Sequence, residues 1–301
     1  MYNNRRNKTE LENKIYRDIQ SEIQKYYDKE GIFYKQDAVA DPEDTIIEFF
    51  SYIYKMIPVT KRKVEYSIEL KNKIDSGELS NKHIDILKKY EQAFEEGQNM
   101  NIFLSSRTTG LNKPDFLLYT WHLYHLHMSG KIVPSKEQMK NNRSDTLLLC
   151  IINSDNAYFL DVIPHPRKAV EFFRLQHLEI ISNNNWMNQI GFDEIPDMIP
   201  GTLKPNIISE NDLFTLYSKC AMNVSFEFNG KGYCACSPMT ANRKPAAAVE
   251  EMIRMNKNIR KLNRPNAIYK GFKFASTENG ILLGLVQFED TKGERICYNI
   301  L

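Results

Sequence analysis

The chain has 301 residues, of which 42% are hydrophobic and 11% aromatic, so it can bury sizeable cores and is not globally disordered. Its 40 basic and 38 acidic residues leave a net charge of +2, so any contact with nucleic acid must use a local basic patch. The five cysteines are scattered, the first residues include no apolar leader, and no apolar run is long enough to cross a membrane. These features predict a soluble, reduced, cytoplasmic protein.

Helical periodicity dominates the first third of the chain. Apolar residues recur at spacing four after Thr9, an N-cap candidate, and Asp41 precedes a proline at the first position of a second helix. Gly97 ends the pattern. The sequence predicts a helical N-terminal region over 1–100, with helices at 9–31, 42–55, 59–76 and 80–96.

The middle third alternates between helix and strand signals. A helix is expected from Asp115 to about His125, and two apolar strands are joined by a turn at 153–156. A stretch rich in proline after residue 195 marks the end of this region. We expect a central α+β domain over 101–200, built on a small antiparallel sheet, with strands at 146–152 and 157–163 and a helix at 170–182.

The last third has the pattern of a second α+β unit, over 201–301. Asn229-Gly230 is a strong hairpin turn, and one amphipathic helix is expected from Pro245 to Leu262. Strands are expected at 213–220, 223–228, 232–237, 267–276, 281–288 and 295–300. The fold class predicted for the whole chain is therefore α+β.

The central hairpin has an arginine before its first strand and a histidine after its second. The segments Asn142-Arg143-Ser144-Asp145-Thr146-Leu147-Leu148-Leu149 and Ala157-Tyr158-Phe159-Leu160-Asp161-Val162-Ile163-Pro164-His165 flank the turn. Over about residues 120–170 this pattern resembles the core hairpin of RelE/YoeB-like bacterial toxins. The resemblance implies a metal-independent endoribonuclease in which Arg143 and His165 match family positions, and in which His127 and Lys131 correspond to basic residues before the hairpin.

The resemblance has clear departures from that family. The flanking regions are foreign to it, and no tyrosine follows His165. A wider segment, from LLYTWHLYHLH to EIISNNNW, also resembles a module of phage-defence and toxin-like proteins. This resemblance implies a role in a toxin–antitoxin or abortive-infection system, with an antitoxin or regulatory protein as a partner.

The chemistry of RNA cleavage without metal suits these residue types. Histidine transfers protons near neutral pH, and arginine binds phosphate oxygens bidentately. His127 or His165 would transfer protons, and Arg143 would stabilise charge on the phosphate. In the alternative reading, His165 only caps backbone carbonyls, and Arg143 pairs with Asp145 or Asp161.

Two further groups are candidates for binding RNA. Asn185 and Trp186 follow a predicted helix, where the indole could stack on a base; in the alternative reading, both residues only cap the end of that helix. A basic stripe on the helix at 245–262 contains Arg254, Lys257 and Lys261. The same charges also match ordinary optimisation of the helix dipole.

A metal site is the weaker reading of the remaining histidines. On a helix, His122 and His125 would lie about 60° apart, and His165 or Asp161 could add a third ligand. Histidines on an apolar helix are more often buried and hydrogen-bonded, and the sequence has no phosphate-binding glycine loop. We therefore expect no cofactor.

These observations predict a toxin-like endoribonuclease or RNA-directed effector that acts without metal. A non-enzymatic module that binds nucleic acid or protein, and a metal-dependent nuclease, are the alternatives. In each case we expect the C-terminal region to bind or regulate, since it contains no histidine.

Overall fold

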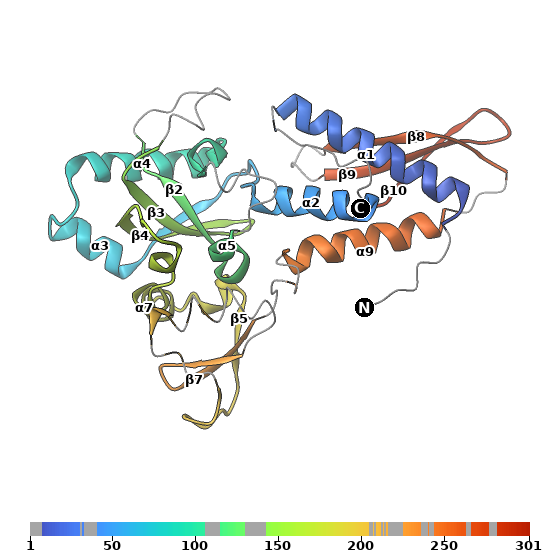
Figure 1. Ribbon diagram of the computed structural model, residues 1–301. Helices are drawn as coiled ribbons and strands as arrows, with labels where there is room; N and C mark the ends of the chain where they lie inside the picture. The colour runs from blue at the N-terminus through green and yellow to red at the C-terminus, as the bar shows by residue number, and fades with distance from the viewer. Residues whose placement is uncertain are drawn as a thin grey trace. The chain divides into compact units, whose positions relative to one another are not determined.

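The computed structural model describes residues 8–30, 32, 41–105, 115–129, 143–204, 207, 209–211, 213, 215, 225–235, 240, 244–262, 266–276 and 282–301. The chain forms an α+β fold divided into two compact units (Figure 1). The terminal unit comprises Met1–Ile53 and Ala247–Leu301, and the central unit comprises Tyr54–Ala246. This grouping differs from the three consecutive regions expected, because the two ends of the chain share one unit.

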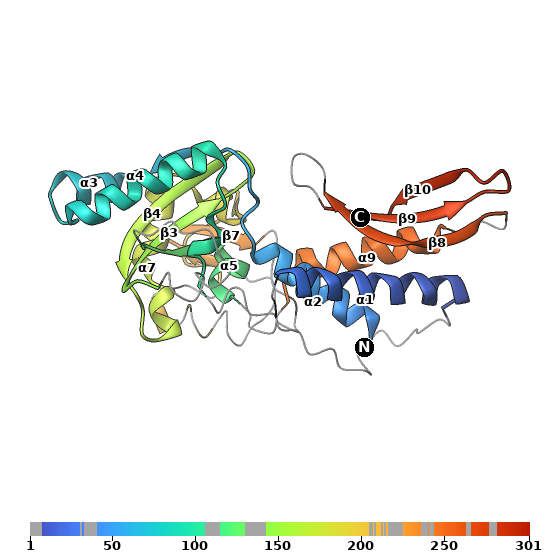
Figure 2. The same cartoon turned by 90° about the horizontal axis from the view of Figure 1, so that it is seen from above.

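The terminal unit consists of helices against a three-stranded antiparallel sheet in the order β10-β9-β8. Figure 2 shows the helices on one side of this sheet. At the start of α1, the Thr9 hydroxyl accepts from the Glu12 amide, and the Glu12 carboxylate accepts from the Thr9 amide, which is a capping box. The elements are α1 (Glu10–Glu30), most of α2 (Pro42–Lys55), α9 (Ala246–Arg260), β8 (Ile268–Ser276), β9 (Leu282–Glu289) and β10 (Arg295–Asn299).

Side-chain contacts join the two ends of the chain within the terminal unit. The Tyr16 hydroxyl donates to Asn256 at 2.6 Å, and the Tyr269 hydroxyl donates to an Asp18 carboxylate oxygen at 2.6 Å. The ring of Phe49 stacks on a ring of β8, that of Phe274, with centroids 5.0 Å apart. The C-terminal strands therefore do not form an independent domain with α9, because their buried face is completed by α1 and α2.

The central unit is built on a four-stranded sheet in the order β1-β4-β3-β2. Neighbouring strands β2, β3 and β4 are antiparallel, and β1 pairs with β4 in parallel. The bounds are β1 (Lys63–Tyr66), β2 (Leu123–His127), β3 (Thr146–Ile152) and β4 (Asn156–Pro164). The hairpin of β3 and β4 confirms the strands predicted there.

Each face of this sheet is covered by its own hydrophobic core. The first core packs under α3 (Ile68–Asp75), α4 (Asn81–Glu96) and the 3-10 helix η1 (Met100–Phe103). On the other face lie α7 (Leu175–Asn183), η3 (Met187–Ile190) and a second antiparallel sheet, β5-β7-β6. That sheet comprises β5 (Phe192–Ile195), β6 (Phe226–Phe228) and β7 (Lys231–Ala235), and α5 (Phe116–Trp121) and η2 (Ala169–Phe172) complete the unit.

Three sequence predictions about these elements were wrong in part. The helix expected at 59–76 is a strand followed by the shorter α3, because β1 adds to the edge of the sheet beside β4. The helix expected to continue to His125 ends at Trp121, and the segment after His122 enters the sheet as β2. The helix expected at 170–182 is divided between η2 and α7.

Turn and cap signals were more reliable. The helix predicted from Ser80 to Glu96 is confirmed, with Ser80 as N-cap and Gly97 in the left-handed conformation. Asn229 and Gly230 both have positive φ, at 51° and 74°, as the predicted hairpin requires. Leu213 and Thr215, the described residues of the strand expected at 213–220, are helical instead. Within the described residues, every helix is too short or too polar to cross a bilayer.

Candidate functional site

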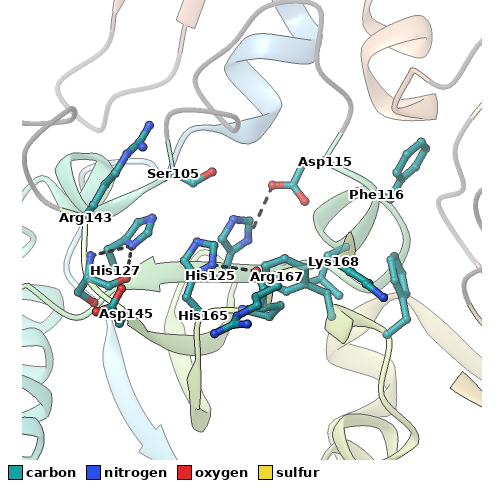
Figure 3. A pocket seen from close by; sticks show the side chains of 15 residues that line it. Ser105, Asp115, Phe116, His125, His127, Arg143, Asp145, His165, Arg167 and Lys168 are labelled. Atoms are coloured by element: carbon teal, nitrogen blue, oxygen red, sulfur yellow. Dashed lines mark hydrogen bonds and ion pairs between the residues drawn. The ribbon is translucent and has the colours of Figure 1, made fainter. Parts of the chain in front are cut away.

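The three residues predicted to be catalytic lie together in one pocket of the central unit, with a volume of about 470 Å³. His127 ends β2, Arg143 precedes β3 and His165 follows β4. The antiparallel register pairs His127 with Leu147 and Thr146 with Pro164, so these strand ends meet at the same end of the sheet. The topology therefore brings basic groups from three separate segments into one cavity (Figure 3).

His127 is buried, with 5% of its surface exposed. Its Nδ1 lies 3.2 Å from both the amide nitrogen and the carbonyl oxygen of Ser144, so it either accepts from the amide or donates to the carbonyl. Burial lowers the pKa of His127 to about 4; the Ser144 backbone opposes this shift, and neighbouring His165 adds to it. The imidazole is therefore neutral at pH 7.

His165 has a defined orientation beside His127. Its Nδ1 donates to the Pro166 carbonyl at 2.9 Å, because a carbonyl oxygen can only accept. The two imidazole rings are stacked, with centroids 5.3 Å apart and an angle of 26° between their planes. Nε2 of His165 is thus the ring nitrogen left for a ligand. The contact with a backbone carbonyl uses Nδ1 and a catalytic role would use Nε2, so one ring can serve both.

A third imidazole, that of His125, lines the same pocket and was not among the catalytic residues predicted. In a strand, residues two apart point to the same face, so His125 and His127 lie side by side, and Figure 3 shows His165 next to both. Burial lowers the pKa of His125, and the Asp115 carboxylate opposes that shift. A spacing of two brings His125 and His127 to the same face only in a strand, so the helical interpretation of this segment concealed the shared face.

Asp115 connects this histidine to the start of α5. Its carboxylate accepts from the Leu118 amide at 3.1 Å as a helix cap, and lies 3.9 Å from Nδ1 of His125. The same carboxylate also affects the pKa of Lys55, whose side chain is fully buried. Burial lowers the pKa of Lys55 to about 8, and the negative charge of Asp115 opposes this lowering. Asp115 therefore caps the helix that was expected to begin at this residue, and the same carboxylate also faces the pocket.

The charges around the pocket favour an anion. Arg143, Arg167 and Lys168 supply three cations, against the carboxylates of Asp115 and Asp145. Arg167 and Lys168 are exposed and follow His165 and Pro166 after the end of β4. With all imidazoles neutral the lining has one excess positive charge, and protonation of any imidazole increases that excess. These two cations were missed because nothing in the sequence distinguishes them from other surface residues.

Asn185 and Trp186 lie elsewhere in the central unit. Asn185 has a φ of 59° and lines a second pocket of about 200 Å³, together with the paired side chains of Glu194 and Lys231. Trp186 is buried, and its ring packs on that of Tyr158 with centroids 5.0 Å apart. The indole face is therefore used in the core, a role that was not among those expected for this residue. Lys131 lies outside the described residues.

The predicted basic stripe lies on α9 and on the residue that follows it, Lys261, in the terminal unit. Arg254, Lys257 and Lys261 are exposed, as expected for an amphipathic helix with one buried face. Arg254 forms an ion pair with Glu251, one turn earlier, which offsets part of its charge. The stripe is thus an exposed basic surface, and none of its residues lines the imidazole pocket.

The helical metal-binding pair of His122 and His125, considered as the weaker reading, does not form. His122 is the left-handed C-cap of α5, whereas His125 lies in β2, so they do not share a helix face. Asp161, considered as a metal ligand or as a partner of Arg143, pairs with Lys73 at 2.9 Å. Among the residues that the structure describes, no group of three histidine, cysteine, aspartate or glutamate side chains is arranged to hold a metal ion.

Comparisons with protein-family models, with curated proteins and with solved structures gave no match to this chain.

Proposed function

We propose that the central unit is a metal-independent endoribonuclease, acting as a toxin-like, RNA-directed effector. The observation that carries this proposal is the convergence of His127, Arg143 and His165 in a pocket with an excess of positive charge. These residue types supply a proton acceptor, a proton donor and a phosphate clamp, which are the groups that cleavage of RNA requires in the absence of metal. The resemblance to RelE/YoeB-like toxins is consistent with the same chemistry.

The reaction assigned to this pocket is an internal transesterification. His127 removes the proton from a ribose 2′-hydroxyl, and O2′ forms a bond to phosphorus. The bond from phosphorus to O5′ then breaks, and protonated His165 supplies a proton to O5′ through Nε2. The products are a 2′,3′-cyclic phosphate and a 5′-hydroxyl, and exchange of protons with water restores both imidazoles.

The assignment of base and acid follows from the surroundings of each ring. His127 is unprotonated at neutral pH because burial lowers its pKa to about 4, although the same shift makes it a weaker base. Its Nε2 is free to accept a proton only in the tautomer in which Nδ1 donates to the Ser144 carbonyl. The hydrogen bond of His165 to Pro166 is retained when that ring is protonated, so Nε2 can deliver a proton without reorientation.

Arg143 has the role of stabilising the phosphorane. A guanidinium presents several donors in a planar fork, which matches two oxygens of a phosphate, and its charge offsets the negative charge that develops in the transition state. Arg167 and Lys168 add positive charge to the same cavity. The RNA backbone would therefore enter with its scissile phosphate beside the imidazoles.

Cleavage of a defined RNA by the purified protein in excess chelator tests this proposal. We expect cleavage with chelator present, products ending in a 2′,3′-cyclic phosphate, and a loss of about a hundredfold or more in kcat for Arg143→Ala. Arg295→Ala, which removes an exposed arginine from β10, is the matched control and should retain full activity. Failure to cleave, or cleavage that depends on added metal, would contradict the assignment.

The cellular role we propose is growth arrest, in a toxin–antitoxin or phage-defence setting. Induced expression should stop growth, and Arg143→Ala should relieve the arrest at equal levels of folded protein. A non-enzymatic RNA-binding module is the second candidate, favoured by the exposed cations of α9. Saturable RNA binding without any cleavage product would support this second function.

A further inference from the structure

The end of the pocket away from Arg143 is aromatic, and the cleavage chemistry does not use it. Phe116 and Phe172 are partly exposed there, and buried Phe173 is packed edge-on against Trp121 with centroids 5.5 Å apart. In the view of Figure 3, Phe116 and Arg143 lie at opposite ends of the row of imidazoles. One cavity therefore joins Arg143 at one end to the phenylalanines at the other through His165 and His125, with Lys168 on the side of Phe116.

We propose that the aromatic end is a nucleobase subsite, so that the pocket holds one unpaired nucleotide with its base against Phe116 and Phe172 and its phosphate at Arg143. The inference rests on the same pocket as the proposed ribonuclease activity, and it names the form of RNA that the pocket accepts. It does not require that the bound nucleotide be cleaved.

The chemistry of the lining favours a nucleotide over a simple anion. A phosphate or sulfate needs the cations alone, whereas a nucleotide needs cations and a flat apolar surface in one cavity, and stacks its base on aromatic rings. The volume of about 470 Å³ falls in the range of pockets that enclose small organic ligands. The ring of Phe172 also packs 5.1 Å from that of His125, which holds one wall of the aromatic end beside the imidazoles.

The same geometry requires the base to be unpaired. A base inside a duplex has both faces stacked and its pairing edge occupied, so it cannot enter a pocket unless it is extruded. Phenylalanine rings have no hydrogen-bonding group and contact the face of a base, so stacking on them tolerates every base. We therefore expect cleavage of single-stranded RNA with weak preference among bases.

Binding of small probes to the intact chain tests the subsite separately from catalysis. Calorimetric titration would compare inorganic phosphate, adenosine and adenosine 3′-monophosphate. We expect the nucleotide to bind about tenfold to a hundredfold more tightly than phosphate, which is the range for stacking of one base. Phe116→Leu and Phe172→Leu, each of which keeps an apolar side chain but removes the ring, should reduce this advantage and leave phosphate binding unchanged.

Phe274→Leu, which removes a half-buried phenylalanine from β8 of the terminal unit, is the matched control and should bind all probes as the unaltered protein does. Equal binding of phosphate and nucleotide, or no saturable binding of any probe, would overturn the subsite. Equal cleavage of single-stranded and double-stranded RNA would also overturn it, while supporting the nuclease. A nucleotide advantage that depends on Phe116 and Phe172, in a protein that cleaves no RNA, would support the subsite and remove the proposed function.

Discussion

All six histidines of the chain lie in the central unit, whereas the terminal unit has none and presents exposed cations along α9. Proton transfer near neutral pH is easiest for imidazole, so the central unit has side chains suited to this chemistry and the terminal unit would need large pKa shifts to match them. Exposed lysine and arginine can still attract a polyanion without any special geometry. The central unit is therefore suited to proton transfer, and the exposed cations of the terminal unit are suited to charge-dependent binding.

The strongest way to break this comparison is to remove an imidazole from the pocket. We expect His165→Ala to lower kcat by about a hundredfold to ten-thousandfold, because it removes a group that transfers a proton in the transition state. His83→Ala provides a matched control, since His83 lies on α4 and contacts Ser80 at the start of that helix. Equal activity of the His165→Ala variant and the unaltered protein would mean that the chemistry lies elsewhere.

The second prediction concerns stability and pH in the central unit. His177 is 1% exposed, and burial lowers its pKa to about 4 from an unfolded value of about 6.5. Between these values the unfolded chain binds more protons than the folded one, so the free energy of unfolding falls as the pH falls from about 7 to about 4. This one group accounts for a loss of up to about 3 kcal/mol, and His127 contributes with the same sign.

Denaturant titration of the unaltered protein and of His177→Asn at several pH values measures this effect. Tryptophan fluorescence follows the central unit alone, because both tryptophans, Trp121 and Trp186, lie in it. The variant lacks the titrating group, so the difference in stability between the two proteins should shrink by about 1–3 kcal/mol as the pH falls. A difference that stays constant with pH would show that His177 is not held neutral in the folded state.

The smallest expected effect belongs to the terminal unit. Replacing Arg254, Lys257 and Lys261 together by glutamine should weaken RNA binding by about tenfold at low salt and reduce its salt dependence, with kcat unchanged at saturating RNA. Because Arg254 is paired with Glu251, the salt slope should fall by about two units and not three. Lys82, Lys88 and Lys89 on α4 allow a control with the same change in charge.

A loss of kcat in the α9 variant, with unchanged affinity, would contradict the division between the two units. An equal loss of affinity in the α4 control would show that RNA responds to the net charge of the chain and not to the stripe. Either result would mean that the cations of α9 do not form the RNA-binding surface.

Much of the local structure could be predicted from the sequence, because the signals that set it are local. Caps at Thr9, Asp41 and Ser80, and the Asn229-Gly230 turn, depend on hydrogen bonds and φ angles within a few residues. The hairpin at 146–163 was predicted for the same reason, with Arg143 and His165 at its ends. Because antiparallel strands place those ends together, two members of the pocket follow from local pattern alone.

Contacts between distant segments decided the rest. The segment after His122 is only five residues long and buried on both faces, so its pattern alone does not distinguish a buried helix from a buried strand, and pairing with β3 selects the strand. That choice places His125 beside His127 and makes the third imidazole part of the pocket. Likewise, the union of both chain ends in one unit depends on packing such as that of Tyr16 on Asn256, 240 residues apart. Side-chain patterns determine which face of an element is apolar, but only the folded chain determines which distant surface covers it.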